Sequence, residues 1–296
     1  MGQKRDKIPV ARQNEPTEMT GKHITVVTGA TGGIGREICR KLVSEGVECL
    51  MLACRNTTKA SRLADELRSE FADSSTEILT GCLDLASLAS VREFAASLAG
   101  NTVDALINNA GIMPGDVTIT EDGIETATQT NVVAPVLLTE LLLPLMHEGS
   151  CVVMTVSVTR KIVWLRPDWI EHAASYHGFM RRFKTYGRSK LVLTHYALDL
   201  SRRVAERGIR VNCADPGVVD SGMISMGNPV VDPLADIFFR PVITSASSGA
   251  MAALSGVSST ESGMIFTHNG KCTPIPASYL ADPLHSRIMS QLLAFV

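Results

Sequence analysis

Two side chains with complementary chemistry, Tyr186 and Lys190, stand four positions apart in the chain. On a helix, that spacing puts both side chains on one face. A free tyrosine has a pKa near 10, which is about three units too high for a base at neutral pH. A nearby cation such as a lysine ammonium favours the phenolate and moves that pKa toward the working range. The pair is therefore a candidate proton donor and acceptor.

A glycine-rich turn, Thr28-Gly-Ala-Thr-Gly-Gly-Ile-Gly35, forms a second candidate site. An apolar strand candidate precedes the turn, and an amphipathic helix candidate, Ile34–Glu45, leads away from it. Gly29, Gly33 and Gly35 would allow a tight turn and let the backbone approach a pyrophosphate at the helix N-terminus. This context favours a nucleotide-binding turn over a purely structural one.

The end of the second strand candidate distinguishes between the two nicotinamide cofactors. A free ribose 2′-hydroxyl is bound by a carboxylate about 20 residues past the glycines. Cys54 occupies that place, and Arg55 follows it. Because a guanidinium suits a 2′-phosphate, the sequence predicts NADP(H) rather than NAD(H). The alternative is a surface arginine that merely begins a loop.

These residues lie on a chain in which apolar, strand-like runs alternate with helical ones. Alternation of this kind predicts a parallel sheet covered by helices on both faces. We therefore expect an α/β fold, a Rossmann-type doubly wound sheet of about seven strands, in one domain over 22–296 after a flexible tail over 1–21. The helix candidate Thr57–Phe71 covers part of this sheet. The strand candidates are His23–Thr28, Glu48–Ala53, Glu77–Cys82, Val103–Ile107, Cys151–Val156, Ile209–Cys213 and Met264–Thr267.

Composition excludes several other classes of protein. A chain of 296 residues with 45% hydrophobic and 20% charged residues is not a disordered chain. The 28 Lys and Arg residues against 30 Asp and Glu leave a net charge of −2, so nucleic acid is not an expected partner. The seven scattered cysteines predict reduced thiols, and no metal site is expected. No apolar run is long enough for a transmembrane segment, so a cytoplasmic protein is expected.

The order of the motifs resembles that of the short-chain dehydrogenases/reductases, over about residues 22–270. The segments 53–56 (ACRN) and 84–95 (DLASLASVREFA) are most similar to the retinol dehydrogenase-like branch, whose members usually take NADP(H). The motifs that carry the resemblance are the glycine turn, Asp84-Leu85, Asn108-Asn-Ala-Gly111, Tyr186-xxx-Lys190 and Pro216-Gly217.

The resemblance implies a fuller set of cofactor contacts. Asp84 would meet the adenine amino group, the backbone from Asn108 to Gly111 would lie beside a ribose, and Val219 and Ser221 would meet the carboxamide. Ser221 stands where the family usually has threonine, and serine keeps the hydroxyl group. Together, the predicted cofactor-binding residues are Gly29, Thr31, Gly33, Ile34, Gly35, Arg55, Asp84, Leu85, Asn108, Ala110, Gly111, Tyr186, Lys190, Pro216, Gly217, Val219 and Ser221.

The resemblance also adds two catalytic residues to Tyr186 and Lys190. Ser157 would hydrogen-bond the substrate oxygen and stabilise developing charge. The family commonly has Asn-x-Ser-Ser at this point, whereas the chain reads Met154-Thr-Val-Ser157, so one serine is lost. Asn131 would hold a water molecule that links Lys190 to solvent. A structural role is the alternative for each of them.

Two variable segments, about 158–185 and 222–244, are the expected substrate loops. The first carries Trp164, Trp169 and Phe179, and the second is rich in Met, Pro and Phe. In the family the second segment closes over the substrate, which excludes water from hydride transfer. The composition favours a small apolar alcohol or carbonyl, such as a steroid, a retinoid or a lipid-derived carbonyl. Alternatively, the Phe238–Phe239 pair packs into a subunit interface, as in a homodimer or homotetramer, or onto a membrane.

The sequence thus predicts an NADP(H)-dependent oxidoreductase that interconverts an alcohol and a ketone or aldehyde. A non-catalytic NADP(H)-binding sensor or scaffold of the same fold is the competing class, and the complete Ser-Tyr-Lys-Asn set argues against it. An NAD-dependent sugar-nucleotide epimerase is a third reading, because Gly32 also fits its glycine motif. The Asn-Asn-Ala-Gly run and the lack of a longer C-terminal domain argue against that reading.

Overall fold

A computed structural model describes residues 20–171, 173–175, 181–219 and 243–296, and its centre is a sheet of eight strands. The spatial order is β10-β9-β6-β5-β4-β1-β2-β3, and every neighbouring pair is parallel except β9 and β10. The strands are β1 (His23–Thr28), β2 (Cys49–Cys54), β3 (Glu77–Cys82), β4 (Thr102–Asn108), β5 (Cys151–Thr155), β6 (Arg210–Asp215), β9 (Met264–Thr267) and β10 (Cys272–Pro274). The predicted doubly wound sheet is confirmed.

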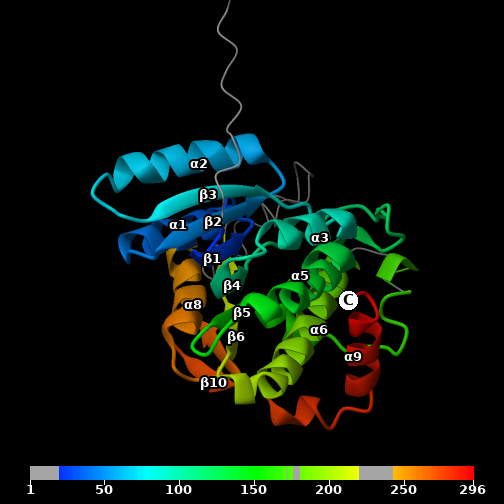
Figure 1. Ribbon diagram of the computed structural model, residues 1–296. Helices are drawn as coiled ribbons and strands as arrows, with labels where there is room; N and C mark the ends of the chain where they lie inside the picture. The colour runs from blue at the N-terminus through cyan, green and yellow to red at the C-terminus, as the bar shows by residue number, and fades with distance from the viewer. Residues whose placement is uncertain (1–19, 172, 176–180, 220–242) are drawn as a thin grey trace, which may run out of the picture.

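The helices form a layer on each face of the sheet (Figure 1). On one face lie α1 (Gly33–Ser44), α2 (Thr57–Glu70) and α8 (Ala246–Ser258). On the other lie α3 (Leu88–Ser97), α5 (Ala134–Leu142) and the long α6 (Arg181–Arg203), with α9 (His285–Leu293) packed outside them. A short helix, α4 (Thr126–Thr128), continues through a π-helical turn, Gln129–Val133, directly into α5.

Alternate residues of each central strand enter two different hydrophobic cores. In β2, for example, Met51 belongs to the core beneath α3, α5 and α6, whereas Leu50 and Leu52 belong to the core beneath α1, α2 and α8. All six residues of this strand are buried. A parallel strand covered on both faces needs apolar side chains in both directions, which explains the uninterrupted apolar run in the sequence.

The direction in which the chain crosses the sheet reverses between β1 and β4. From β1 the chain proceeds outward through β2 to β3, and it then returns to β4 on the other side of β1. In open α/β sheets, ligands bind in the crevice outside the carboxyl ends of the strands at such a switch point. The turn after β1 and the chain after β4 therefore lie where a ligand is expected.

The predicted strands match the observed ones to within about two residues, and three of them, including β1 and β3, match at both ends. The sequence missed β10, the antiparallel edge strand, which is short and exposed at all three residues. It also missed a two-residue ladder between β7 (Val218–Val219) and β8 (Ile243–Thr244). The limits of the predicted tail and domain stay predictions.

Candidate active site

The turn between β1 and α1 packs tightly against the chain that follows β4. Gly29 has a φ of +63°, and a Cβ atom added to it would lie 2.9 Å from Cα of Ala110. A Cβ atom on Gly35 would overlap the carbonyl oxygen of Gly29 and lie 2.9 Å from the Nδ2 atom of Asn109. These two glycines are therefore required by the packing of the protein itself.

Gly33 is different, because the protein leaves the space beside it open. The nearest atom to an added Cβ would be Cβ of Ala246, at an ordinary 3.7 Å. Gly33 begins α1, and the preceding Gly32 has no side chain to cap the helix. The N–H groups of the first turn are therefore available to an anion, which is how helix N-termini bind phosphates.

This helix end borders a cleft of about 430 Å³. Besides the glycine turn, the cleft is lined by residues from the ends of β2, β3 and β4. The predicted cofactor residues that line it are Gly29, Thr31, Gly33, Ile34, Gly35, Arg55, Asp84, Leu85, Ala110 and Gly111. An elongated dinucleotide fits these features. The helix N-terminus and the open space at Gly33 suit its phosphates, and they lie between Arg55 and Asp84 on one side and the backbone at Ala110 and Gly111 on the other.

One predicted residue, Asn108, does not face the cleft with its side chain. Asn108 is buried, and its Nδ2 atom donates to Oγ1 of Thr139 over 3.0 Å and contacts the sulfur of Met154 at 3.4 Å. Its side chain thus connects β4 to α5 and β5. The neighbouring Asn109, which the sequence did not single out, lines the cleft and donates from Nδ2 to the carbonyl oxygen of Thr28.

The end of β2 presents two cations rather than one. Arg55 lines the cleft, and so does Lys59 in the first turn of α2. Asn56 caps that helix by accepting a hydrogen bond at 2.9 Å from the backbone N–H of Lys59. The cap fixes where α2 begins and so places Lys59 near Arg55. Lys59 was not predicted from the sequence, although its place four positions after Arg55 indicates a second cation at this end of the cleft.

Lys190 lies at the inner end of the site, buried to 1% exposure. Its Nζ atom donates to the carbonyl oxygen of Thr155, at the end of β5, over 2.8 Å. A Cβ atom added to Gly111 would lie 3.3 Å from this Nζ and 3.5 Å from Oδ1 of Asn131. The structure therefore brings Lys190, Asn131 and the predicted ribose-binding backbone together. Burial lowers the pKa of Lys190 to about 8, because an ammonium group is less stable away from water.

Tyr186 lies one helical turn before Lys190 on α6, and the lysine Nζ is 5.5 Å from the centre of its ring. Burial first, and the negative charge of Asp215 second, raise the pKa of Tyr186 to about 12. The expected lowering by Lys190 is thus not seen in the protein by itself, because loss of hydration outweighs the effect of a lysine that hydrogen-bonds a backbone carbonyl. At neutral pH the phenol is protonated, which is the form needed to donate a proton.

Asn131 occupies the π-helical turn between α4 and α5 and is fully buried. Its Oδ1 atom accepts from the N–H of Ile112, and its Nδ2 atom donates to the carbonyl oxygen of Ile112, both over 2.8 Å. Nδ2 also lies 3.2 Å from Oγ of Ser189, a neighbour of Lys190 on α6. Asn131 therefore connects the chain after β4 to α6. π-Helical turns often occur at functional sites.

Ser157 follows β5 and begins a short 3₁₀ turn, Val158–Ile162. Its Oγ atom accepts from the backbone N–H of Thr159 over 3.3 Å and from Oγ1 of Thr159 over 3.1 Å. Since Oγ is the acceptor in both bonds, its own proton remains to be donated to a substrate oxygen. The role that the resemblance implied for Ser157 stays a prediction.

A buried ion pair that the sequence did not predict supports this serine. A guanidinium nitrogen of Arg160 donates to the carbonyl oxygen of Ser157 over 2.7 Å and to Oδ2 of Asp215 over 2.6 Å. Both side chains are less than a tenth exposed. The pair joins the end of β5 to the end of β6, and the charge of Asp215 also acts on Tyr186. The two residues are 55 positions apart, so no local motif signals the contact.

The predicted substrate segments are only partly described. Trp169 is buried, at 3% exposure, in the core beside α6, whereas Trp164 is 70% exposed. After β6, the carbonyl oxygen of Pro216 accepts from Oγ1 of Thr244 over 3.2 Å, and Gly217 has a φ of +74°. Val219 pairs through its backbone with Thr244. Phe179, Ser221 and most of the segment 222–244 lie outside the described residues.

A doubly wound sheet, a glycine turn with free N–H groups at its switch point and a Tyr-Lys pair on one face of α6 are features of a nucleotide-dependent dehydrogenase or reductase. A family model described as short chain dehydrogenase matches residues 23–229. The chain therefore belongs to the short-chain dehydrogenase/reductase family, and its relatives place it in the retinol dehydrogenase-like branch.

Among these relatives, a polyprenol dehydrogenase of Mus musculus is 37% identical over 210 residues, which are 67% of this chain and 60% of that protein. The match thus spans less than two thirds of that relative. A polyprenol dehydrogenase of Danio rerio is 31% identical over 94% of this chain and 88% of its own length. Retinol dehydrogenase 14 of Mus musculus is 30% identical over 81% of this chain and 76% of its own.

Solved structures show the same fold at lower identity. An uncharacterised protein from Mycobacterium paratuberculosis superposes with a TM-score of 0.71 at 24% identity, over 93% of each chain. A short chain dehydrogenase from Burkholderia cenocepacia J2315, in complex with NADP, has a TM-score of 0.62 at 23% identity, over 82% of this chain and 93% of its own. Within the described residues, we find no helix that is both long and apolar enough to cross a membrane.

Proposed function

We propose that this protein is an NADP(H)-dependent oxidoreductase that interconverts an apolar alcohol and the corresponding ketone or aldehyde. The observation that carries this proposal is the convergence of four side chains at the carboxyl edge of the sheet. Tyr186 and Lys190 lie on one face of α6, Asn131 contacts the residue beside Lys190, and Ser157 ends β5 with a proton to donate.

Preference for the phosphorylated cofactor is supported by charge at the end of β2. A 2′-phosphate needs cations, and Arg55 and Lys59 line the cleft there. The backbone N–H groups at the start of α1 would hold the pyrophosphate, and Asp84 would accept from the adenine amino group. Lys190 lies beside Gly111, where it would hold the ribose hydroxyls.

The chemistry divides between the cofactor and the side chains. When bound, the nicotinamide ring supplies or accepts the hydride. In carbonyl reduction, Tyr186 donates its proton to the substrate oxygen, and the Ser157 hydroxyl donates a hydrogen bond to the same oxygen. Lys190 and Asn131 would then form the path by which a proton returns from solvent to the phenolate of Tyr186. In alcohol oxidation the same proton moves in the opposite sense.

An apolar substrate is supported by composition and by relatives. The segment that leads away from Ser157 exposes Val158, Ile162 and Trp164. Relatives are named polyprenol dehydrogenase and retinol dehydrogenase, and both names denote apolar alcohols. A cytoplasmic location is part of the proposal, because all seven cysteines are free, as in reducing compartments.

Substitution of Tyr186 by Phe tests the proposed mechanism. Tyr186→Phe keeps the ring but removes the group that transfers the proton, so turnover of an apolar carbonyl should fall at least about a hundredfold. The affinity for NADPH, measured by nicotinamide fluorescence, should stay nearly unchanged. A control substitution, Tyr279→Phe, removes a hydroxyl from a tyrosine that stacks on His195 and should leave turnover intact.

Two outcomes would count against the proposed function. Wild-type turnover by Tyr186→Phe would exclude the proton-transfer role. A wild-type protein that binds NADPH but turns over none of a broad panel of retinoids, steroids, polyprenols and their carbonyls would favour the non-catalytic binding protein instead.

A further inference from the structure

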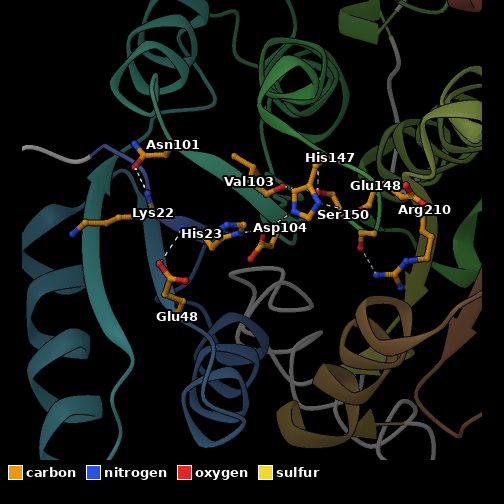
Figure 2. A network of polar contacts seen from close by, with 11 residues as sticks. Lys22, His23, Glu48, Asn101, Val103, Asp104, His147, Glu148, Ser150 and Arg210 are labelled. Atoms are coloured by element: carbon orange, nitrogen blue, oxygen red, sulfur yellow. Dashed lines mark hydrogen bonds and ion pairs between the residues drawn. The ribbon is translucent and has the colours of Figure 1, made fainter.

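At the edge of the sheet opposite the cleft, three metal-binding side chains converge (Figure 2). His23 is the first residue of β1, Asp104 lies near the start of β4, and His147 lies in the turn that leads to β5. Oδ1 of Asp104 is 2.8 Å from Nδ1 of His23 and 2.9 Å from Nε2 of His147. All three ligand atoms lie within 4.8 Å of one another.

The hydrogen bonds of His147 determine which of its nitrogens can bind a cation. Nδ1 lies 2.6 Å from the backbone carbonyl oxygen of Glu148, which can only accept a hydrogen bond. Nδ1 therefore carries the proton, and in the neutral ring Nε2 has a lone pair. That lone pair faces the Asp104 carboxylate, which is also an acceptor. A metal cation between them would be bound by both.

This arrangement resembles the way that proteins prepare a histidine for a metal. Metal-bound histidines almost always donate their other ring N–H to a carbonyl or carboxylate, which fixes the tautomer and the ring orientation. The carbonyl of Glu148 serves His147 in this way (Figure 2). A second carboxylate lies beside the site, since Oε1 of Glu48 accepts from the backbone N–H of His23 over 3.2 Å.

The backbone around the three ligands is held independently of any ion. His23 and Asp104 lie on neighbouring paired strands, β1 and β4. The turn that carries His147 is held to β4 by Ser150, whose Oγ accepts from the N–H of His147 and donates to the carbonyl of Val103. The ligands are therefore positioned by the sheet before a metal binds, which reduces the entropy lost on binding.

We propose that His23, Asp104 and His147 form a binding site for a divalent transition metal, with zinc as the best match. Two imidazole nitrogens and one carboxylate oxygen form a recognised zinc ligand set, and water completes the tetrahedron. Zinc bonds of about 2.0–2.1 Å place tetrahedral ligand atoms about 3.3 Å apart. The closest pairs need to separate by only about half an ångström, which half-exposed side chains can do. The bound ion joins β1, β4 and the turn before β5.

Equilibrium dialysis of the full, tag-free chain against zinc tests this proposal. We expect one zinc ion per chain in the wild type, and at least about tenfold weaker binding in His147→Ala and in Asp104→Asn, since even residues behind the ligands change affinity 10- to 100-fold. Asp65→Asn is the matched control, because it removes an exposed carboxylate that pairs with Arg68 instead of a histidine. Far-UV circular dichroism confirms that each variant is folded.

Cobalt identifies the ligands by a second readout. Cobalt bound at this site should show the visible absorption of a four- or five-coordinate ion without a thiolate charge-transfer band, because no cysteine belongs to the site. That band would indicate binding at an exposed thiol, Cys82 or Cys272, instead. Failure of the wild type to bind zinc would overturn the proposal. Equal binding by all variants would also overturn the proposal.

Discussion

Burial controls the two residues that the proposed reaction needs most. Lys190 and Tyr186 lie together on α6, with Lys190 beside Gly111 of the cleft, and loss of hydration acts on both of them. It lowers the pKa of the lysine to about 8 and raises the pKa of the tyrosine to about 12. In the protein alone, each group is therefore shifted toward its neutral form. A bound cofactor with a positive ring would favour the phenolate and so reverse the shift of Tyr186.

The buried lysine has a measurable consequence for stability. Below about pH 8, Lys190 is charged in both the folded and unfolded chains, and the folded protein bears the full cost of burying the ammonium. Above that pH, the folded chain releases its proton first, so the cost falls until the unfolded lysine also titrates near its ordinary 10.5. Relative to Lys190→Met, the wild type should gain about 1 kcal/mol between about pH 7 and 9.

Urea unfolding of the cofactor-free wild type and Lys190→Met at several pH values would measure this difference. Lys190 influences the thiol of Cys213, but burial raises the pKa of Cys213 to about 12, so the folded chain keeps this thiol protonated over the range and the contribution of the cysteines cancels. A difference in unfolding free energy that stays constant over this pH range would show that Lys190 has an ordinary pKa.

Arg55 tests the choice of cofactor in a separate part of the site. A charge-assisted hydrogen bond to a phosphate contributes roughly 1.5–3 kcal/mol, so Arg55→Ala should weaken NADPH binding by about tenfold to a hundredfold. NADH has no 2′-phosphate, so its affinity should hardly change. Titrations of both cofactors with both proteins measure the effect. Equal affinity of the wild type for NADH and NADPH would contradict the assignment.

Single residues differ in how far the sequence reveals them. The glycines Gly29, Gly33 and Gly35 lie within seven residues of chain, and Tyr186 and Lys190 are four positions apart. The spacing within each group therefore reveals it in the sequence. The Arg160–Asp215 pair and the cluster of His23, Asp104 and His147 join residues 43 to 81 positions apart. Only the order of strands in the sheet brings such residues together, and no local pattern encodes that order.

At the scale of elements, the glycines of the β1–α1 turn have different roles: Gly35 is needed for packing, whereas Gly33 leaves space for a phosphate. Gly35→Ala would force the Cβ atom into the carbonyl of Gly29, so it should destabilise the fold. Gly33→Ala meets only Ala246 at an ordinary distance, and alanine favours a helix by up to about 1 kcal/mol over glycine. Gly33→Ala should therefore keep or raise the melting temperature while weakening NADPH binding at least about tenfold, since the methyl group occupies the phosphate position.

Thermal melts and NADPH titrations on these two variants separate the tasks. Gly46→Ala is the control, because Gly46 lies outside the cleft. No atom lies within 4 Å of an added Cβ there, but φ is +76°, so the substitution should lower stability without changing the intrinsic affinity for NADPH. Unchanged NADPH affinity in Gly33→Ala would show that no phosphate approaches this residue.

Elements whose apolar pattern is uniform could be predicted best. The central strands β1 and β2 are buried almost throughout, and they were predicted at both ends and to within one residue, respectively. The edge strand β3, which is only partly buried, was also predicted at both ends. The helical segment before α5 contains a π-helical turn at Asn131, which the sequence did not predict. That turn depends on hydrogen bonds from Asn131 to Ile112, which is distant in the sequence and contributes nothing to helical periodicity.

At the scale of the whole molecule, the two edges of the sheet differ in their chemistry. The carboxyl edge carries the glycine turn, the cations at the end of β2 and the proposed catalytic residues. The amino edge carries the cluster of His23, Asp104 and His147. The central strands that connect the two edges carry mostly apolar side chains. A metal at the amino edge would therefore affect stability rather than the proton transfer.

The C-terminal part of the chain is held to the rest by a second pair of histidines. His195 on α6 and His285 on α9 are both buried, with their Nδ1 atoms 3.2 Å apart. The ring of Tyr279 stacks on His195 at 4.4 Å, and Asp199 lies 3.5 Å from Nε2 of His285. Burial first, and His285 second, lower the pKa of His195 to about 4, against a smaller opposing effect of Asp282.

This histidine pair predicts a loss of stability in mild acid. Between about pH 6.5 and 4, the unfolded chain protonates His195 while the folded chain does not, so stability falls as the pH falls through this range. At about 1.4 kcal/mol per pKa unit, the loss from this residue approaches about 3 kcal/mol at the acid end. Glutamine does not titrate in this pH range. The unfolding free energy of His195→Gln should therefore fall by about 3 kcal/mol less than that of the wild type. Urea unfolding across this range measures both slopes, and hydrogen exchange should show α9 opening first in the wild type. Parallel pH profiles for the two proteins would mean that His195 takes up its proton without disturbing the packing of α9 against α6.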